Sequence, residues 1–301
     1  MDWEAWLRKA AARPSNHEDS KREKTEKEVK VALAASDALK GRPYRVYVKG
    51  SYANNTNVRL NYDVDVAVEY YGYFYFDLVF DLEDHPKSDV GVVSSDDPYS
   101  RDEFKRDIKD ALVTAFGSAA VETGSIAYRV RKKMTTLPAD VVPCWEYRRY
   151  DRITASVPIF QQGSCVYPTG ESRKANYPQQ QYDNGVTKNE ATGRRYKRMT
   201  RVLKRLQTRL LDAGVELDSI ASYHVECIVY NVPDDHFNHL TYKADLRAVL
   251  AFMFNQTLAD GNWNDWKEVN GLKYLFRGGG GPTRAQVHAF ASAAWDKVGF
   301  E

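Results

Sequence analysis

Hydrophobic residues alternate with polar ones along parts of the first half of the chain, and this pattern predicts strands. Residues 44–48 (Tyr-Arg-Val-Tyr-Val) and 64–68 (Val-Asp-Val-Ala-Val) are rich in β-branched residues, so each predicts a strand. Residues 119–130 predict two shorter strands. Residues 16–38 and 100–116 predict helices, the second with a Ser-x-x-Glu capping box and an apolar face. The first half is therefore expected to be a sheet with accompanying helices.

The second half of the chain is predicted to be mainly helical. Residues 189–211 carry an apolar stripe at helical spacing, and further helices are expected towards the C-terminus. Residues 151–188 are polar and turn-rich, so we expect them to connect two lobes, either lining a cleft or running as ordinary surface chain. The pattern predicts an α+β protein with two domains, residues 1–160 and 161–301.

An aromatic run follows the second predicted strand. Residues 69–76 read Glu-Tyr-Tyr-Gly-Tyr-Phe-Tyr-Phe, and we expect the strand to end here in a loop that packs on the core. The alternative is an aromatic platform on which a nucleobase or a single strand stacks. The polar residues 77–98 are expected to form a loop.

Composition narrows the class of protein. The 301 residues are 43% hydrophobic, which is enough for a substantial core, and the formal net charge of +2 gives no whole-molecule attraction to nucleic acid. The three cysteines include no Cys-x-x-Cys pair, so a reducing cytosol fits better than a disulfide framework or a zinc site. The N-terminus does not resemble a signal peptide, and no stretch approaches about 18 apolar residues. We therefore expect a cytoplasmic protein that does not cross a membrane.

The candidate chemistry begins where the first predicted strand ends. Gly50 and Ser51 follow that strand; a glycine lets backbone approach a ligand, and the N–H groups of a turn or helix start can hold a phosphate. Further on, Asp63 and Asp65 share one face of the second strand, with Cα atoms roughly 6.6 Å apart because side chains alternate along a strand. Two carboxylates on one rigid edge suit one or two divalent ions and a bound triphosphate.

An Asp-x-Asp pair by itself is usually a solvated strand face. Here, however, Val64 and Val66 point to the core, and carboxylates among apolar neighbours are costly unless they are paired or bind a metal. Asp140 is a lone acid in an apolar strand bounded by two prolines, and it needs a partner for the same reason. A metal ion shared with Asp63 and Asp65 would supply that partner.

These residues carry a resemblance to known enzymes. The Gly-Ser turn, the Asp-Val-Asp pair and the later strand carboxylate are similar to those of the nucleotidyltransferase superfamily of DNA polymerase β type. Residues 50–66, Gly-Ser-Tyr-Ala-Asn-Asn-Thr-Asn-Val-Arg-Leu-Asn-Tyr-Asp-Val-Asp-Val, resemble a narrower group. That group is the bacterial cGAS/DncV-like nucleotidyltransferases (CD-NTases), which make cyclic oligonucleotide signals in anti-phage defence. The resemblance covers about residues 18–260.

The resemblance implies a fold and a set of metal ligands. It implies a polymerase-β-like core, in which a mixed twisted sheet is accompanied by helices, and a C-terminal helical lobe, with a long N-terminal helix bracing both lobes. It also implies that Asp63, Asp65 and Asp140 are the catalytic residues and hold two Mg²⁺ ions, with Mn²⁺ as an alternative.

The resemblance further implies a site for the nucleotide. Residues 196–206 (Tyr-Lys-Arg-Met-Thr-Arg-Val-Leu-Lys-Arg-Leu) are similar to the family helix that contributes a triphosphate-binding lysine. On this match the lysine is Lys204, with Arg201 as a neighbouring phosphate contact. Ser222 and Tyr223 match a serine–tyrosine pair that binds phosphate and stacks on the donor base; the alternative is a helix cap and a core tyrosine. Triphosphate binding is thus assigned to Gly50, Ser51, Lys204 and Ser222, and base stacking to Tyr223.

The implied function is a cyclic oligonucleotide synthase. It would join NTPs into a cyclic di- or trinucleotide, with release of pyrophosphate by two-metal catalysis, in CBASS-type defence. ATP and/or GTP are the favoured substrates, pyrimidine nucleotides are left open, and defence-operon regulators are candidate partners. A monomer is expected. DNA activation is not expected, because the sequence lacks the zinc-ribbon Cys/His cluster of the animal DNA sensor.

Two other functions stay open from the sequence. One is an RNA-tailing or tRNA-type template-independent nucleotidyltransferase, which would need a basic RNA-binding surface that a near-neutral chain hardly offers. The other belongs to a different class, a non-catalytic nucleotide-binding module in which the acidic residues are structural.

Overall fold

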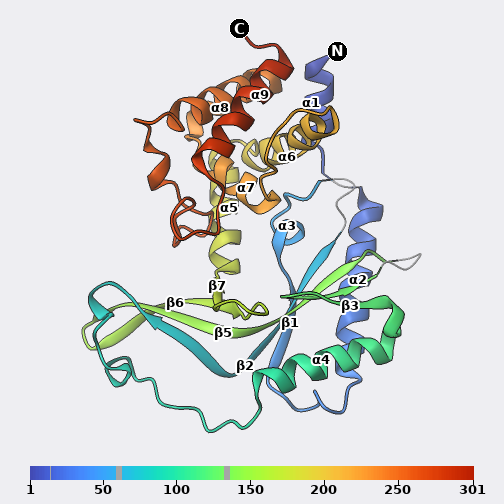
Figure 1. Cartoon of the computed structure of the whole chain (residues 1–301), viewed down its shortest axis with the longest axis vertical. Coiled ribbons are helices and arrows are strands. Elements are labelled where there is room, and N and C mark those ends of the chain that lie inside the picture. Colours follow the sequence, from blue (N-terminus) through green and yellow to red (C-terminus); the bar gives the residue numbers. More distant parts are fainter. Residues whose placement is uncertain (14, 59–62, 132–135) are drawn as a thin grey trace. The chain divides into compact units, whose positions relative to one another are not determined.

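The computed structural model describes residues 1–13, 15–58, 63–131 and 136–301 of the chain (Figure 1). The chain forms two compact units. The sheet unit comprises Ser15–Gly50 and Tyr62–Pro178, and the helical unit comprises Met1–Pro14, Ser51–Asn61 and Gln179–Glu301. The boundary expected between residues 160 and 161 falls inside a strand, β6, which pairs with β5 and stays in the sheet unit.

The sheet unit is built on one mixed sheet. In the described residues this sheet has seven strands in the order β1-β2-β5-β4-β3, with β6 paired to β5 and β7 paired to β6 (Figure 1). β2 and β5 run parallel, and the other pairs are antiparallel. The strands are β1 (Tyr44–Val48), β2 (Val64–Leu78), β3 (Val121–Thr123), β4 (Tyr128–Val130), β5 (Ala139–Thr154), β6 (Val157–Val166) and β7 (Lys174–Asn176).

Two helices pack against each other and against this sheet, namely α2 (Asn16–Ala34) and α4 (Arg101–Phe116). Each begins with a capping box, in which a serine hydroxyl accepts from a backbone N–H and a glutamate three residues later accepts from the serine N–H. The box expected at Ser100 is therefore confirmed. The bracing of a second lobe by the long N-terminal helix stays a prediction. Short elements complete the unit: η1 (Phe80–Leu82), η2 (Lys87–Val90) and η3 (Ser118–Ala120).

The strands extend further than the sequence pattern indicates. The expectation that the aromatic run at 69–76 is a loop is wrong, because β2 continues through it to Leu78 and pairs with β5 on both sides of a register shift between Tyr70 and Phe74. The run does pack on the core: Tyr70 is buried and its ring lies 5.3 Å from that of Phe104. Residues 151–176, expected to be turn-rich, likewise contain the end of β5 together with β6 and β7. The partner strand decides these segments, because it supplies the hydrogen bonds that local propensity does not encode.

The helical unit is a cluster of helices around one apolar core. The predicted helix at 189–211 is two helices, α5 and α6, which are separated by a short turn. α6 has one face buried all along its length, including Leu203 and Leu206, which pack with Leu246 and Phe290 of later helices. The α-helices are α1 (Trp3–Ala11), α5 (Pro178–Ala191), α6 (Tyr196–Asp212), α7 (Ser222–Tyr230), α8 (Tyr242–Gln256) and α9 (Arg284–Val298). Two 3-10 turns, η4 (Asp234–His236) and η5 (Asn262–Asp265), lie between them, and α3 (Gly50–Ala53) spans the point where the chain passes from one unit to the other.

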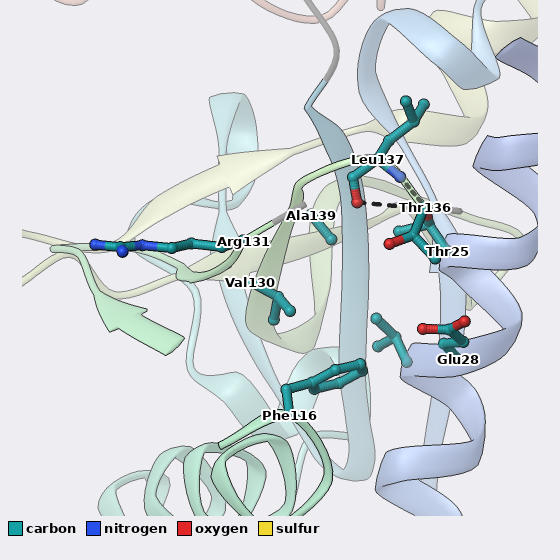
Figure 2. A pocket seen from close by; sticks show the side chains of 9 residues that line it. Thr25, Glu28, Phe116, Val130, Arg131, Thr136, Leu137 and Ala139 are labelled. Atoms are coloured by element: carbon teal, nitrogen blue, oxygen red, sulfur yellow. Dashed lines mark hydrogen bonds between the residues drawn. The ribbon is translucent and has the colours of Figure 1, made fainter. Parts of the chain in front are cut away.

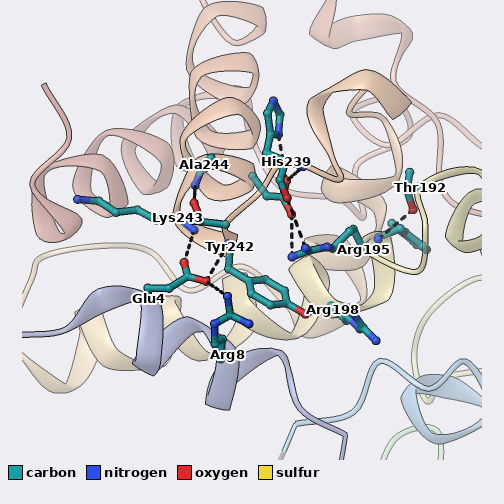
Figure 3. A network of polar contacts seen from close by, with 12 residues as sticks. Glu4, Arg8, Thr192, Arg195, Arg198, His239, Tyr242, Lys243 and Ala244 are labelled. Atoms are coloured by element: carbon teal, nitrogen blue, oxygen red, sulfur yellow. Dashed lines mark hydrogen bonds and ion pairs between the residues drawn. The ribbon is translucent and has the colours of Figure 1, made fainter.

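A polar network ties the N-terminal helix into this cluster (Figure 3). Glu4 of α1 accepts hydrogen bonds from the backbone N–H groups of Tyr242 (3.2 Å) and Lys243 (2.9 Å), which open α8. A carboxylate at this position suits the positive end of a helix dipole. In the same network, the fully buried Asp245 pairs with Arg195 at 3.2 Å and accepts from the backbone N–H of His239 at 2.7 Å. None of the helices that the structure describes has both the length and the apolar character that a membrane span requires.

Candidate active site

The parallel pairing of β2 and β5 brings two of the predicted acids together. The register sets Asp65 opposite Asp140, flanked by the pairs Val64–Ala139 and Val66–Val141, which are all buried. Partners in register on neighbouring strands lie about 5 Å apart and point to the same face. Asp63 directly precedes β2 and lies two residues from Asp65, so the structure gathers all three acids at one edge of the sheet unit.

An arginine that the sequence analysis did not single out lies among these acids. Arg129 of β4 is the register partner of Asp140, and its Nε donates to Asp140 Oδ1 at 3.1 Å. Its Nη2 donates to Asp63 Oδ2 at 3.2 Å, so one guanidinium bridges carboxylates from two different segments. The hydrogen bond to Asp140 is the main cause that raises the pKa of Arg129. The only local signal was its position between the buried Tyr128 and Val130; the pairing of β4 with β5 was needed to find it.

Asp65 is partly buried, as is Asp140, whereas Asp63 is exposed. Burial raises the pKa of the Asp65 carboxyl to about 6; Lys49 lowers that pKa, and Asp140 and Asp63 add to the rise. A carboxylate in this position is short of positive charge at neutral pH. Residue 50 must also be glycine here, because its φ is +71° and an added Cβ would lie 2.2 Å from Asp65 Oδ2. The close approach that the sequence predicted at Gly50 is therefore an approach to a carboxylate.

The donor set suits a hard divalent cation. Three carboxylates with Arg129 between two of them leave an excess of negative charge, and Mg²⁺ prefers carboxylate oxygens. In the conformation described, however, no three His, Cys, Asp or Glu side chains of the described residues are arranged so that they could hold one ion. The ligand set Asp63, Asp65 and Asp140 therefore stays a prediction that rests on chemistry and strand register.

The entry of β5 into the sheet is fixed by α2 (Figure 2). The Thr25 hydroxyl accepts a hydrogen bond from the Leu137 N–H at 2.9 Å and donates to the Lys21 carbonyl at 2.8 Å. Thr25 and Leu137 are both buried and line a small pocket with Val130 and Ala139. This contact holds the chain three residues before Asp140. Residues 132–135, just before it, lie outside the described part of the chain, as do residues 59–62 of the quoted motif.

In the helical unit, Lys204 belongs to a buried network. Its ammonium donates to the Thr56 carbonyl at 3.1 Å and lies 3.8 Å from the Glu226 carboxylate. The Thr56 hydroxyl donates to that carboxylate at 2.5 Å, and the Thr56 N–H donates to the Ser51 carbonyl at 2.9 Å. Gln181 supplies a further donor to Glu226 at 3.3 Å. The predicted Ser51 and Lys204 are thus linked through Thr56, and burial lowers the pKa of Lys204. An acid inside the apolar run of residues 225–230 was the sequence signal for Glu226.

Arg201 also donates hydrogen bonds to backbone carbonyl groups. Its Nε donates to the Ala11 carbonyl at 2.9 Å and its Nη1 to the Asn55 carbonyl at 2.6 Å. Burial is the main cause that lowers its pKa, to about 10, and Arg13 contributes to the shift. These bonds fasten α1 and the segment after Ser51 to α6.

Ser222 and Tyr223 open α7. Ser222 is exposed, and no side chain caps the helix at Ala221, so the first N–H groups of α7 have no capping side chain as a partner. Tyr223 is partly buried, and its hydroxyl donates to Glu268 Oε2 at 2.7 Å. Asn270 donates to the same oxygen at 2.7 Å. The tyrosine ring is therefore fixed by a pair of residues that the sequence analysis did not name.

Comparisons with known proteins agree with this architecture. Residues 183–299 match the model of the cGAS/DncV-like nucleotidyltransferase C-terminal helical domain. The chain is 36% identical over 289 residues to a cyclic dipyrimidine nucleotide synthase CdnE of Cecembia lonarensis, covering 95% of each protein. The fold matches the CdnE c-UMP-AMP synthase of Rhodothermus marinus, solved with Apcpp and Upnpp, with a TM-score of 0.84, 28% identity and coverage of 99% and 98% of the two chains. It also matches a CdnE cyclic dinucleotide synthase of Elizabethkingia meningoseptica, solved with GTP and Apcpp, with a TM-score of 0.80, 30% identity and full coverage of both chains.

The fold and these similarities define an enzyme of the nucleotidyltransferase class, and they confirm the expected α+β architecture. The chain belongs to the cGAS/DncV-like nucleotidyltransferase family.

Proposed function

We propose that this enzyme joins two NTPs into a cyclic dinucleotide and releases pyrophosphate. The observation that carries the proposal is the register of β2 and β5, which sets Asp65 beside Asp140 and close to Asp63. Relatives that share about a third of the sequence along nearly the whole chain are cyclic nucleotide synthases, so the same chemistry is the simplest assignment for these acids. In each of two rounds, a ribose hydroxyl oxygen would attack the α-phosphorus of the next nucleotide, and the bond to pyrophosphate would break.

Asp63, Asp65 and Asp140 would hold the divalent ions, two Mg²⁺ or Mn²⁺. When bound, such ions lower the pKa of the acceptor hydroxyl and neutralise charge on the triphosphate. Asp140 would take the hydroxyl proton, and the pairing of β2 with β5 would hold Asp65 beside it. Gly50 would serve this site by leaving room for the Asp65 carboxylate.

Residues of the helical unit would hold the nucleotide. The uncapped start of α7 and the exposed Ser222 hydroxyl suit a phosphate, because helix N-termini present free N–H groups and a positive dipole. Ser51 would contact the triphosphate, with Lys204 and Arg201 supplying positive charge close to the segment that carries it. The Tyr223 ring would stack on the donor base.

The bases remain to be assigned by experiment. Among the relatives described above, one is named for two pyrimidines, one for UMP and AMP, and one was solved with GTP and an ATP analogue. We propose ATP or GTP as one substrate, with a pyrimidine nucleotide as the second candidate.

We also propose a cellular setting. The three cysteines are buried free thiols, which fits a reducing cytoplasm. An anti-phage role of CBASS type, with regulators encoded in the same operon, follows from the family resemblance, as does activity as a monomer without DNA. Protection of a bacterial host against phage, present with the wild-type gene and absent with an Asp63→Ala, Asp65→Ala gene, would test the role.

The biochemical test is direct. The full chain is incubated with all four NTPs and Mg²⁺, one NTP carrying an α-³²P label at a time, and the products are treated with phosphatase and separated by HPLC. A phosphatase-resistant dinucleotide is expected, and linkage-specific nucleases then identify its bonds. The double variant Asp63→Ala, Asp65→Ala should give no product. Asp110→Asn, which changes an exposed acid of α4 in the same unit, is the control and should behave as wild type. Activity in the double variant, or extension of RNA in place of cyclic product, would refute the proposal.

A further inference from the structure

The acids of the sheet unit already have a cation beside them, and it comes from the protein itself. Arg129 contacts Asp140 at 3.1 Å and Asp63 at 3.2 Å, and these are the carboxylates that we expect to bind a divalent ion. A guanidinium and a divalent ion that need the same carboxylate oxygens cannot both use them fully.

We propose that Arg129 is a built-in counter-cation of this acidic site, which holds Asp63 and Asp140 until a divalent ion displaces it. The inference rests on the proposed function in one respect, that these acids bind a divalent ion. It makes Arg129 a positioning residue and not a catalytic one.

The geometry favours a contact that can be exchanged. The Arg129 side chain is 53% exposed and Asp63 is 45% exposed, so the guanidinium can swing into solvent without leaving a buried charge. Ion pairs at such exposure contribute little to stability, because water and salt screen them. Asp140, at 25%, is the better shielded partner, and it is the one that Arg129 faces in register. A doubly charged ion with a demand for carboxylate oxygens outcompetes a single guanidinium in this setting.

The arrangement also explains why the acids are not in a ligand geometry. The fork of Arg129 spans oxygens of two carboxylates, which sets their orientation to suit planar N–H donors and not a spherical ion. Without any cation, the negative charges of Asp63 and Asp140 would raise the energy of the ionised, partly buried Asp65 next to them. Arg129 therefore lowers the cost of the empty site while reducing its affinity for metal.

The experiment measures metal affinity in the absence of nucleotide. Mn²⁺ is titrated into the full-length protein, and the free ion is followed by electron paramagnetic resonance. Removal of the competing charge in Arg129→Gln should tighten Mn²⁺ binding by about three- to tenfold, the effect of one partly screened charge at contact distance. The melting temperature of the same variant should rise more on addition of Mn²⁺ than that of wild type.

Two further variants make the result specific. Arg106→Gln is the control, because Arg106 lies on α4 of the same unit, is 62% exposed and contacts Asp107 at 3.5 Å, a carboxylate that is not one of the three expected metal ligands; its Mn²⁺ affinity should equal that of wild type. Arg129→Lys keeps the charge but loses the planar fork, so its affinity should lie between those of wild type and Arg129→Gln. If Arg129→Gln does not fold, the Mn²⁺ affinity of Arg129→Lys tests the proposal instead, and it should be higher than that of wild type.

Failure of this inference can be told from failure of the proposed function. Mn²⁺ binding that is lost in Asp63→Asn but is no tighter in the Arg129 variants than in wild type overturns only the role of Arg129. Absence of Mn²⁺ binding to the wild-type protein, or equal binding to Asp63→Asn, overturns the metal site and this inference together.

Discussion

Asp65 of β2 lies opposite Asp140 of β5 in the parallel register of the two strands. The two residues come from distant parts of the sequence. Their relative position is set by the pairing of β2 with β5 and does not depend on a flexible loop. Rigid strands hold reacting groups more precisely than loops do, which is what in-line phosphoryl chemistry demands. The predictions below test the surroundings of this pair and of the residues proposed to bind nucleotide.

The first prediction concerns Gly50. Gly50→Ala adds a methyl group 2.2 Å from Asp65 Oδ2 and should reduce cyclic dinucleotide synthesis at least about tenfold, because the carboxylate must move. Gly41→Ala is the control: Gly41 has a similar φ of +74° but nothing within 4 Å of an added Cβ. Both variants should lose about 1–2 kcal/mol of stability from the left-handed backbone alone. Equal activity of the two variants in the HPLC assay would contradict a special requirement at residue 50.

The second prediction concerns the buried pair of Lys204 and Glu226. Glu226→Ala leaves the lysine without a carboxylate and the Thr56 hydroxyl without its acceptor, so the free energy of unfolding should fall by about 3–5 kcal/mol. Urea unfolding followed by circular dichroism measures this. Glu216→Ala, which truncates an exposed glutamate in the same unit, should change stability by no more than about 0.5 kcal/mol. If Glu226→Ala caused a similarly small loss of stability, water would be taking the place of the carboxylate as the partner of Lys204 and Thr56.

The third prediction separates the two parts of Tyr223. Tyr223→Ala removes the ring and should raise the KM for NTP by about ten- to a hundredfold, the worth of one base–aromatic stack. Tyr223→Phe keeps the ring and loses only the hydrogen bond to Glu268, so its KM should rise by much less. Steady-state kinetics at saturating Mg²⁺ distinguish the two. If the KM for NTP rises equally in Tyr223→Phe and Tyr223→Ala, the hydrogen bond from the hydroxyl to Glu268 matters more than stacking of the ring.

The fourth prediction concerns pH. Burial lowers the pKa of His224 below its usual value of 6.5, so the unfolded chain takes up the proton first as the pH falls. The stability associated with neutral His224 is therefore complete above about pH 6.5 and is lost as the pH drops through the lowered pKa. His224→Gln should flatten the dependence of the melting temperature on pH as the pH falls below about 6.5. His17→Gln, at an exposed position of α2, is the control; an identical slope in wild type and His224→Gln would rule out this source.

Local sequence was sufficient for several elements. The capping box at Ser100 and Glu103 is determined by interactions within a few residues, and the strand at residues 44–48 is indicated by its β-branched and aromatic residues. The pair Asp63 and Asp65 was found for the same reason, since alternation along one strand places both on one face. The length of β2 could not be predicted from local propensity, because its aromatic end becomes a strand only through pairing with β5.

By itself, the sequence determined the chemical inventory of this protein: three acids in apolar strands, a glycine–serine turn, and a serine–tyrosine pair at a helix start. Only the tertiary structure decided how these groups are paired. The register of β4 against β5 places Arg129 on Asp140, and the packing of α6 on α7 buries Lys204 with Glu226. The physical reason is that charge pairing depends on distances of a few ångströms between segments far apart in the chain, and sheet register and helix packing set those distances.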